Sequence, residues 1–288
     1  MLVVSGSIAL DTLEGPYGLA PDELGGSALY FGLAASLIVP VLLVAGVGRT
    51  DEEAVREVVA GRPIDLAGLD VVDAQTFRWH ARHVGHGNQD LGREDSIYRL
   101  WRPRLPAQAR GWAFAGSMLP DLQLDFLQQA GSLDLRASDA MLSYTRSAPV
   151  AARAVVGASS WYFANADELR ALGGEPRGPE AFRAAHGLDG LCVKAGPAGA
   201  RVVTATEDVH VPALSSRAVV DTTGAGDALA AGFLARRLSA PETGLREALE
   251  YGVACASITI EDVGLRSLRR ATPADLAARL REVQDLRA

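Results

Sequence analysis

The segment from Asp221 to Phe233 carries the residues best suited to chemistry. It reads Asp-Thr-Thr-Gly-Ala-Gly-Asp-Ala-Leu-Ala-Ala-Gly-Phe and follows an apolar run that ends at Val220. We expect a helix to begin at the glycines, because helix-forming residue types continue beyond them. The first turn of such a helix has unpaired backbone N–H groups and partial positive charge. Gly224 and Gly226 would let an anion approach those N–H groups closely.

Asp227 places a carboxylate beside this predicted anion hole. Two negative charges repel, so a carboxylate here does not suit simple phosphate binding. It does suit a base that takes a proton from a hydroxyl while the N–H groups of Gly224, Ala225 and Gly226 stabilise charge on a moving phosphoryl group. The alternative is a plain glycine-rich turn in which Asp227 only complements the helix dipole.

Two other phosphate-binding loops fit this segment less well. The chain contains no Gly-Lys dipeptide, which a P-loop requires. A dinucleotide-binding fingerprint would need glycine at the position of Leu229.

A second group of candidates lies near the N-terminus. Asp11 comes shortly after the first apolar run, and the pair Gly25 and Gly26 comes just before a helical pattern. In an open α/β sheet, ligands bind at the carboxyl ends of strands, so these residues suit a substrate site. The carboxylate would accept hydrogen bonds from hydroxyls, and the glycines would allow close approach. The alternative is that they are turn residues only.

Two more segments place polar residues directly after an apolar run. Asn165 and Glu168 have the spacing of a helix capping box. Lys194 ends another run and leads into a turn with Gly196 and Gly199, which is also typical of a simple hairpin. Lys194 is the single lysine among 28 basic residues, and it could supply a compact positive charge to phosphates.

The elements that position these residues alternate along the chain. Apolar runs predict buried strands at 2–5, 41–47, 111–115, 133–137, 161–164 and 191–193. Helical patterns occupy 26–38, 51–60, 121–130, 150–157, 167–172, 224–238, 243–259 and 273–286. Residues 200–211 alternate more and suit a hairpin near the sheet edge. We predict an α/β fold, a three-layer α/β/α sandwich with a central, mostly parallel sheet.

Residues 75–102 depart from this alternation. An alternating segment, a polar turn over 85–92 and a second segment over 96–101 predict a long antiparallel hairpin. Alternation would place Arg78 and His80 on one face and Phe77 and Trp79 on the other. With a strand near 11–17, this hairpin would form a lid from which Arg78 or His80 contacts the substrate. The apolar face would suit a homodimer contact through the lid.

Three histidines at every third position, His80, His83 and His86, raise the alternative of a zinc site. On a strand this spacing alternates faces, and no cysteine lies nearby in the sequence, so we do not expect zinc ligation.

Composition narrows the class of protein. The 288 residues are 48% hydrophobic, enough for a large core, and the net charge of −7 argues against nucleic acid or an anionic membrane as partner. Cys192 and Cys255 lie in apolar surroundings and predict buried, reduced thiols. The N-terminus does not resemble a signal peptide, and no uninterrupted apolar run is long enough to span a membrane. We therefore expect a cytoplasmic protein.

The segment Asp-Thr-Thr-Gly-Ala-Gly-Asp resembles the C-terminal signature of the ribokinase-like (PfkB-type) sugar and nucleoside kinases. Other landmarks occur in the order of that family, so the resemblance covers nearly the whole chain. It implies one kinase domain over 1–288, with a β-lid from about 11–17 and 75–102. It also implies ATP and Mg²⁺ as cofactors, a small-molecule acceptor, Asp227 as the base, and Gly224, Ala225 and Gly226 as the anion hole.

The resemblance assigns roles to the remaining candidates. It implies that Asp11, Gly25 and Gly26 hold the acceptor, and it places Tyr30 where many members have an asparagine that binds sugar hydroxyls. This departure favours an acceptor other than plain ribose, such as a nucleoside or inositol. Further implied roles are nucleotide binding by Lys194, Gly196, Gly199, Asn165 and Thr223, Mg²⁺ binding by Glu168 and Asn165, directly or through water, and a monovalent cation such as K⁺ near Asp221.

Two alternatives to a kinase stay open on the residues alone. One is a non-catalytic sugar- or nucleotide-binding protein that keeps the fold, against which the intact Gly-Ala-Gly-Asp segment argues. The other is a Rossmann-type oxidoreductase, against which the missing glycine fingerprint argues.

Overall fold

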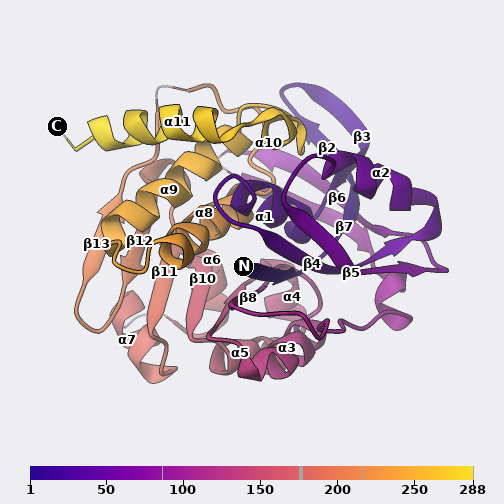
Figure 1. Ribbon diagram of the computed structural model, residues 1–288, viewed down its shortest axis with the longest axis horizontal. Helices are drawn as coiled ribbons and strands as arrows, with labels where there is room; N and C mark the ends of the chain where they lie inside the picture. The colour runs from indigo at the N-terminus through magenta and orange to yellow at the C-terminus, as the bar shows by residue number, and fades with distance from the viewer. Residues whose placement is uncertain (86, 175–177, 216, 288) are drawn as a thin grey trace.

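The computed structural model describes residues 1–85, 87–174, 178–215 and 217–287. Within these residues, nine strands form the larger sheet in the order β13-β12-β11-β10-β9-β8-β1-β4-β5 (Figure 1). The strands from β11 to β5 in this order run parallel, and β12 and β13 are antiparallel. Their bounds are β1 Leu2–Ser5, β4 Val41–Gly48, β5 Ile64–Val72, β8 Trp112–Ala115, β9 Leu135–Asp139, β10 Trp161–Asn165, β11 Gly190–Lys194, β12 Ala200–Val203 and β13 Asp208–Val211.

Alternate residues of the central strands enter two separate apolar clusters, because a strand points successive side chains to opposite faces. Leu2 and Val4 of β1 pack in one cluster with helices α1 (Ser27–Ala35), α8 (Ala225–Ser239) and α9 (Leu245–Thr259). Val3 packs in the other cluster, with α3 (Pro120–Gln129) and α5 (Pro149–Ala158). Helices therefore cover both faces of the sheet, and the prediction of a three-layer α/β fold is confirmed (Figure 1).

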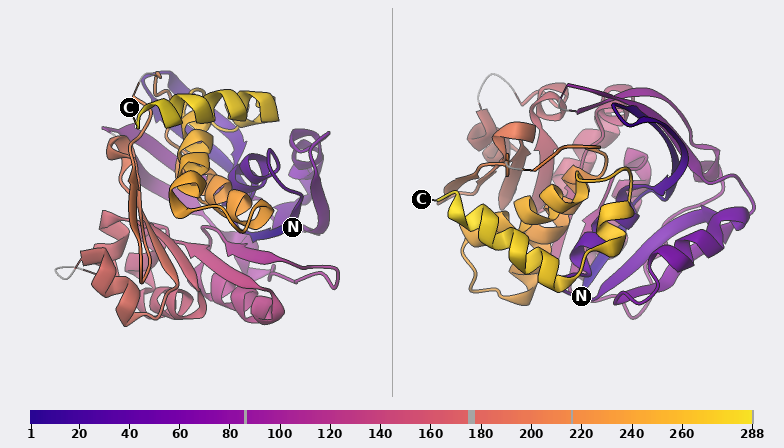
Figure 2. Two further views of the ribbon diagram at one scale, coloured as in Figure 1. Left: turned by 60° about the vertical axis from the view of Figure 1, so that its left-hand side comes forward. Right: turned by 90° about the horizontal axis from the view of Figure 1, so that it is seen from above.

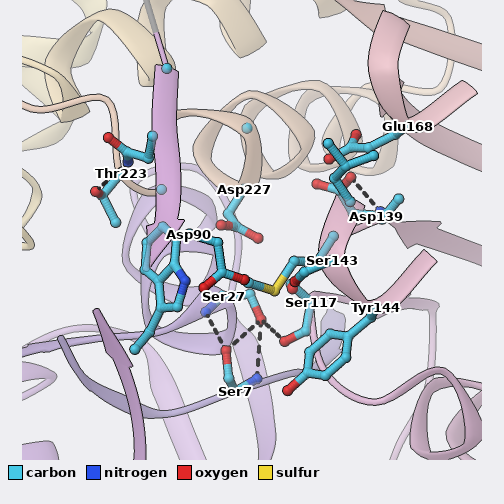
Figure 3. A pocket seen from close by; sticks show the side chains of 18 of the residues that line it. Ser7, Ser27, Asp90, Ser117, Asp139, Ser143, Tyr144, Glu168, Thr223 and Asp227 are labelled. Carbon is cyan, nitrogen blue, oxygen red and sulfur yellow. Dashed lines mark hydrogen bonds between the residues drawn. The ribbon is translucent and has the colours of Figure 1, made fainter. Parts of the chain in front are cut away.

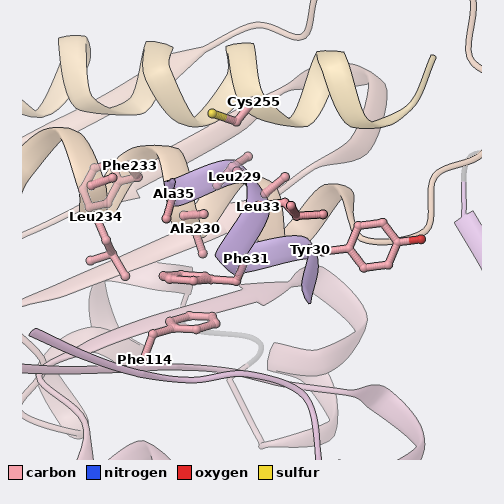
Figure 4. Close-up of a cluster of buried hydrophobic side chains, with 14 of the residues drawn as sticks. Tyr30, Phe31, Leu33, Ala35, Phe114, Leu229, Ala230, Phe233, Leu234 and Cys255 are labelled. Atoms are coloured by element: carbon pink, nitrogen blue, oxygen red, sulfur yellow. The ribbon is translucent and has the colours of Figure 1, made fainter. Parts of the chain in front are cut away.

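Helix α1 connects the core to the pocket described below. Phe31 stacks on Phe114 of β8, with ring centroids 4.2 Å apart (Figure 4). The neighbouring Tyr30 points away from this stack, out of the other side of the helix (Figure 4). One short helix thus anchors in the core and carries an aromatic side chain toward the ligand-binding end of the sheet.

Most predicted elements are found with ends shifted by a few residues, and the edge hairpin over 200–211 is present as β12 and β13. The edge strand β5 and three short helices, α4 (Leu142–Ser147), α7 (Gly178–Ala185) and α10 (Arg266–Arg270), were not predicted. They are short or mix polar and apolar residues, so their periodicity is weak. The remaining helices are α2 Glu52–Val58, α6 Ala166–Ala171 and α11 Pro273–Asp285. No helix in the described ranges is long and apolar enough to cross a membrane.

A smaller sheet lies beside the larger one. Its order is β3-β2-β6-β7, and only the pair β2 and β6 is parallel within the described residues. Its bounds are β2 Ala9–Gly15, β3 Gly18–Gly25, β6 Phe77–Val84 and β7 Gly87–Glu94. Figure 2 shows these strands as a curved layer at one side of the molecule. We refer to this sheet as the lid.

The prediction of a hairpin over 75–102 was wrong in one respect. The returning strand is the polar segment 87–94, which was expected to be largely turn. The segment that was expected to return, 96–101, begins with the 3₁₀ helix Ser96–Arg99 instead. Its apolar residues pack inward, with Tyr98 stacked on Phe77 at 5.5 Å between ring centroids. Burial of these side chains in the core therefore outweighs their strand propensity.

Candidate active site

A pocket of about 740 Å³ opens at the carboxyl ends of the parallel strands, between the larger sheet and the lid (Figure 3). Strand ends, the first turn of α8 and lid strands β6 and β7 all contribute to its walls. Many of the residues singled out from the sequence line it together: Asp11, Gly26, Tyr30, Asn165, Glu168, Lys194, Thr223, Gly224, Gly226 and Asp227. Residues more than 200 positions apart in the chain thus meet in one cavity, as expected at the ligand-binding edge of an open α/β sheet.

Helix α8 begins in the pocket wall at Gly224. This residue has a left-handed backbone with φ of 74°, and a Cβ atom there would lie 2.0 Å from the ring of Tyr30. Both the conformation and the lack of space require glycine. The N–H of Ala225 donates to the carbonyl of Thr222 at 3.2 Å, and Asp227 stands in the first helical turn. The carboxyl group of Asp227 therefore lies in the first turn of α8, at the wall of the pocket.

Asp227 lies between an acidic pair and the loop that precedes α8. Figure 3 shows Asp139 and Glu168 on one side of it and Thr223 on the other. Burial and the nearby Asp139 raise the pKa of Asp227 to about 8, against the opposing effect of Lys194. A carboxyl group with such a pKa can accept a proton near neutral pH, which suits a general base.

Lys194 forms ion pairs with the two acidic side chains on this side of the pocket. Its Nζ atom lies 2.6 Å from Asp139 Oδ1 and 3.7 Å from Glu168 Oε2. A Cβ atom on Gly226 would be 3.2 Å from the same Nζ, so the ammonium group also lies against the start of α8. Burial lowers the pKa of Lys194, but Asp139 and Glu168 outweigh burial and raise it, so the side chain is a cation.

The capping box predicted at Asn165 is confirmed. The backbone N–H of Glu168 donates to Asn165 Oδ1 at 2.9 Å, and the N–H of Asn165 donates to Glu168 Oε2 at 2.7 Å. Glu168 is buried, and burial raises its pKa to about 7 although Lys194 opposes this. Asn165 and Glu168 cap α6 and also line the pocket. Their role in the capping box is therefore compatible with a role at the pocket.

The opposite half of the pocket has polar atoms without partners. Asp11 is 2% exposed, and its Oδ1 atom accepts no hydrogen bond from the described residues. Burial and the charges of Asp221 and Asp227 raise its pKa well above the ordinary value. A Cβ atom on Gly25 would lie 2.3 Å from Asp11 Oδ2, so glycine is needed beside this carboxyl group.

Tyr30 is 1% exposed, and its hydroxyl group also lacks a partner among the described residues. Gly26 has φ of 96°, and a Cβ atom there would lie 2.4 Å from the carbonyl oxygen of Ser7. This close approach brings Ser7 and Ser27 within hydrogen-bonding distance at the base of the pocket (Figure 3).

Comparisons with known proteins show the family and the fold of this chain. The family model of pfkB carbohydrate kinases matches residues 34–271, which is most of the chain. The chain belongs to the pfkB family. The family predicted from the Asp-Thr-Thr-Gly-Ala-Gly-Asp segment is therefore confirmed.

Solved structures of nucleoside and sugar kinases share this fold over nearly their full length. A nucleoside kinase from Burkholderia thailandensis in complex with ADP-inosine has a TM-score of 0.82 at 16% identity, covering 98% of this chain and 96% of that chain. The nucleoside kinase of Methanocaldococcus jannaschii has a TM-score of 0.79 at 18% identity, covering 98% of both chains. A Vibrio cholerae fructokinase bound to fructose, ADP and calcium has a TM-score of 0.79 at 17% identity, covering 97% and 98%.

A curated relative is similar over a shorter stretch. The ATP-dependent ribose-1-phosphate kinase of Halopiger xanaduensis is 44% identical over 77 residues. The aligned part covers 27% of this pfkB chain and only 25% of the length of that relative.

Some sequence-predicted residues lie away from the pocket. Arg78 pairs with Asp22, and His80 Nε2 lies 2.8 Å from Glu14 Oε1, both on the outer face of the lid. The pocket is lined instead by Phe77 and Trp79, from the opposite face of β6. The alternation was predicted correctly, but the face assigned to the substrate was wrong, because the apolar face turns toward the body of the protein.

The lid offers no support for the predicted homodimer contact, for the same reason. Phe77 is 5% exposed and packs on Tyr98 within the chain, so the apolar lid face is already covered. The expectation that His80, His83 and His86 do not form a zinc site stays a prediction. His83 Nδ1 lies 3.4 Å from Thr222 Oγ1, and His86 lies outside the described residues. Within the described part of the chain, no group of three or more metal-binding side chains gathers.

Gly196 and Gly199 are also absent from the pocket lining. Gly199 has φ of 90°, and a Cβ atom there would lie 2.0 Å from the carbonyl oxygen of Val211, so packing within the β12–β13 region requires glycine. Asp221 is buried behind the pocket wall, where it accepts bonds from the backbone N–H groups of Thr223 and Gly264.

The second lid strand and the segment around α4 bring further residues to the pocket that were not predicted from the sequence. Asn88, Gln89 and Asp90 come from β7, and Met141 and Tyr144 from the α4 region. The cluster of polar residues over 88–90 could have indicated a polar strand that faces a ligand. Such a cluster is also typical of a turn, which is what the sequence predicts there.

Proposed function

We propose that this protein transfers the γ-phosphoryl group of ATP to a hydroxyl group of a small neutral acceptor, with Asp227 as the general base. The observation that carries the proposal is the position of Asp227 in the first turn of α8, beside the left-handed Gly224, in the pocket that also contains Asp11. The carboxylate would take the hydroxyl proton as the oxygen attacks phosphorus. The backbone N–H groups of Gly224 and Gly226, and that of Ala225 once it leaves its 3.2 Å bond to the carbonyl of Thr222, would stabilise the charge on the phosphoryl oxygens.

The donor set suits Mg²⁺ at the acidic side of the pocket. Glu168 and Asn165 supply oxygen atoms there, and magnesium is often held by few carboxylates and several waters. When bound, the ion would offset negative charge on the phosphates of ATP. Lys194 would supply a second positive charge at the same place, because its Nζ atom lies beside Gly226.

The acceptor half of the pocket favours a neutral molecule that combines hydroxyl groups with an apolar part. Asp11 and Asp90 place two carboxyl groups in the lining, the second paired with Arg93 at 3.3 Å, and carboxyl groups suit hydroxyl groups of an acceptor better than an anion. Phe77, Trp79 and Met141 supply an apolar surface suited to a flat ring. These features support a nucleoside over a sugar phosphate as acceptor.

A coupled assay of ADP formation tests the proposal. The acceptor panel should contain nucleosides, neutral sugars, polyols and ribose 1-phosphate. We expect turnover stimulated by at least one neutral acceptor and abolished in Asp227→Asn. Binding of nucleotide without any acceptor-stimulated turnover would support a non-catalytic binding protein instead.

A further inference from the structure

The outer lid strand β7 contacts the loop that carries the anion hole. Asn88 Nδ2 donates to Thr223 Oγ1 at 2.8 Å. The Oδ1 atom of the same amide lies 3.5 Å from Thr222 Oγ1, and His83, paired with Asn88 across the lid, lies 3.4 Å from that hydroxyl group. The lid therefore contacts both threonines that precede Gly224.

Thr223 also forms hydrogen bonds with Asp221, which lies behind the pocket wall. Thr223 Oγ1 donates to Asp221 Oδ1 at 2.8 Å, and its backbone N–H donates to the same oxygen at 3.0 Å. Asp221 Oδ2 accepts from the N–H of Gly264 at 3.0 Å. Thr223 and Asp221 are both buried. A continuous chain of hydrogen bonds thus runs from the lid through Thr223 to the loop after α9.

The direction of these bonds restricts what residue 88 can be. The Thr223 hydroxyl group has one proton, and that proton is donated to Asp221. The oxygen can then only accept from the lid, so residue 88 must be a donor. The amide of Asn88 meets this need, whereas an aspartate of the same shape would not.

We propose that Asn88 is a positioning residue for phosphoryl transfer, which fixes Thr223 and so the orientation of the Gly224–Gly226 N–H groups when the lid is closed. The inference rests on the proposed function of that hole. Asn88 itself lines the acceptor half of the pocket beside Asp90. An acceptor that stabilises the closed lid therefore also orders the hole that receives the phosphoryl group, and an open lid leaves the hole loose. This coupling would limit the loss of ATP to water when no acceptor is bound.

The first test is steady-state kinetics of Asn88→Ala and Asn88→Asp. Both remove the donor, and the second keeps the shape of the side chain. We expect kcat to fall about tenfold or more, because small displacements of a reacting geometry are costly. The KM values for ATP and acceptor should change less than about threefold. The matched control is Arg82→Ala, which breaks an ion pair with Glu14 on the outer face of the same sheet and should leave kcat unchanged.

The second test needs no activity. Hydrogen–deuterium exchange of residues 221–227 in the unliganded protein should speed up about threefold or more in both Asn88 variants and stay unchanged in Arg82→Ala. Unchanged exchange in this segment would overturn the inference, as would a rise in acceptor KM at constant kcat, which indicates a simple substrate contact. If the wild-type protein phosphorylates no acceptor, the proposed function fails, and the exchange measurement still decides whether Asn88 orders the loop.

Discussion

Lys194 Nζ lies 2.6 Å from Asp139 Oδ1 in the wall of the pocket, and the two side chains are 15% and 5% exposed. The single lysine of the chain is therefore paired inside the protein. From the sequence, Lys194 is predicted either to end a simple hairpin strand or to supply a charge to ATP phosphates. The structure gives it a second task, since it is also the counter-ion of Asp139 and Glu168.

Replacing Lys194 by Met should destabilise the fold. The change leaves Asp139 buried without its cation, and breaking a buried pair by removing one partner costs about 3 kcal/mol or more. The free energy of unfolding, measured with urea, should recover in part in the double variant Lys194→Met/Asp139→Asn, which removes both charges. Equal stability of wild type and Lys194→Met would show that the pair contributes nothing.

The activity should depend on pH through Asp227. Its pKa is raised to about 8, chiefly by burial and by Asp139, so kcat/KM should rise with pH until that carboxyl group has lost its proton. Asp139→Asn removes a neighbouring negative charge and should move this rise to lower pH. The profile of Arg82→Ala, a variant on the outer lid face, should match that of wild type. A profile that stays in place in Asp139→Asn would contradict the electrostatic account.

Asp227→Asn should separate activity from stability. We expect kcat to fall by about 100- to 10,000-fold through loss of the base. A carboxyl group whose pKa is raised by folding destabilises the folded state at every pH above its unfolded pKa, and this effect is complete above the folded pKa. The variant should therefore be more resistant to urea than wild type at pH 9, and this difference should disappear at acidic pH. Near-normal kcat would remove Asp227 from the role of base.

Gly224→Ala tests the geometry of the hole against a matched position. Gly61 has φ of 76°, almost the same as Gly224, but nothing lies within 4 Å of a Cβ atom there. Gly61→Ala should cost about 1–2 kcal/mol for the left-handed conformation alone. Gly224→Ala should cost a further 1–3 kcal/mol or so because its Cβ atom meets the ring of Tyr30. Equal costs in thermal or urea unfolding would argue against this close packing.

Asp90→Asn should change the preference for acceptor charge. Removing the charge of Asp90, which also leaves Arg93 without this ion-pair partner, should raise kcat/KM for ribose 1-phosphate, relative to a neutral nucleoside, by about tenfold. The ratio of the two kcat/KM values is the measurement, because it cancels general effects on the enzyme. An unchanged ratio would mean that Asp90 does not face the acceptor.

The fold could be predicted largely from sequence because its central strands are continuous apolar runs. Strand β4, for example, is buried along its whole length, and such runs have few alternatives in a chain with intervening helices. Strand β7 could not be found this way. Its residues are polar, and its place in the lid depends on pairing with β6 and on contacts with a loop 135 residues away.

The site was predictable where residue type alone carries the information. The glycines and Asp227 stand where expected at the first turn of α8. The orientation of the lid was not predictable, since alternation separates Phe77 and Arg78 onto two faces but does not say which face meets the body. The catalytic and binding roles assigned to these residues remain predictions until the variants are measured.

The position of β1 in the middle of the larger sheet has a consequence for biosynthesis. Its residues Leu2–Ser5 pair with Val41–Val44 on one side and with the much later segment Trp112–Ala115 on the other. The helix that packs on α1 spans Ala225–Ser239, later still. Strand β1 therefore keeps one edge unpaired until β8 has been synthesised, and contacts so distant in sequence slow folding. A chain that ends before residue 225 would lack α8, α9 and α11, which pack in the same cluster as α1 on one face of the larger sheet. It would also lack the first turn of α8, which forms part of the pocket wall.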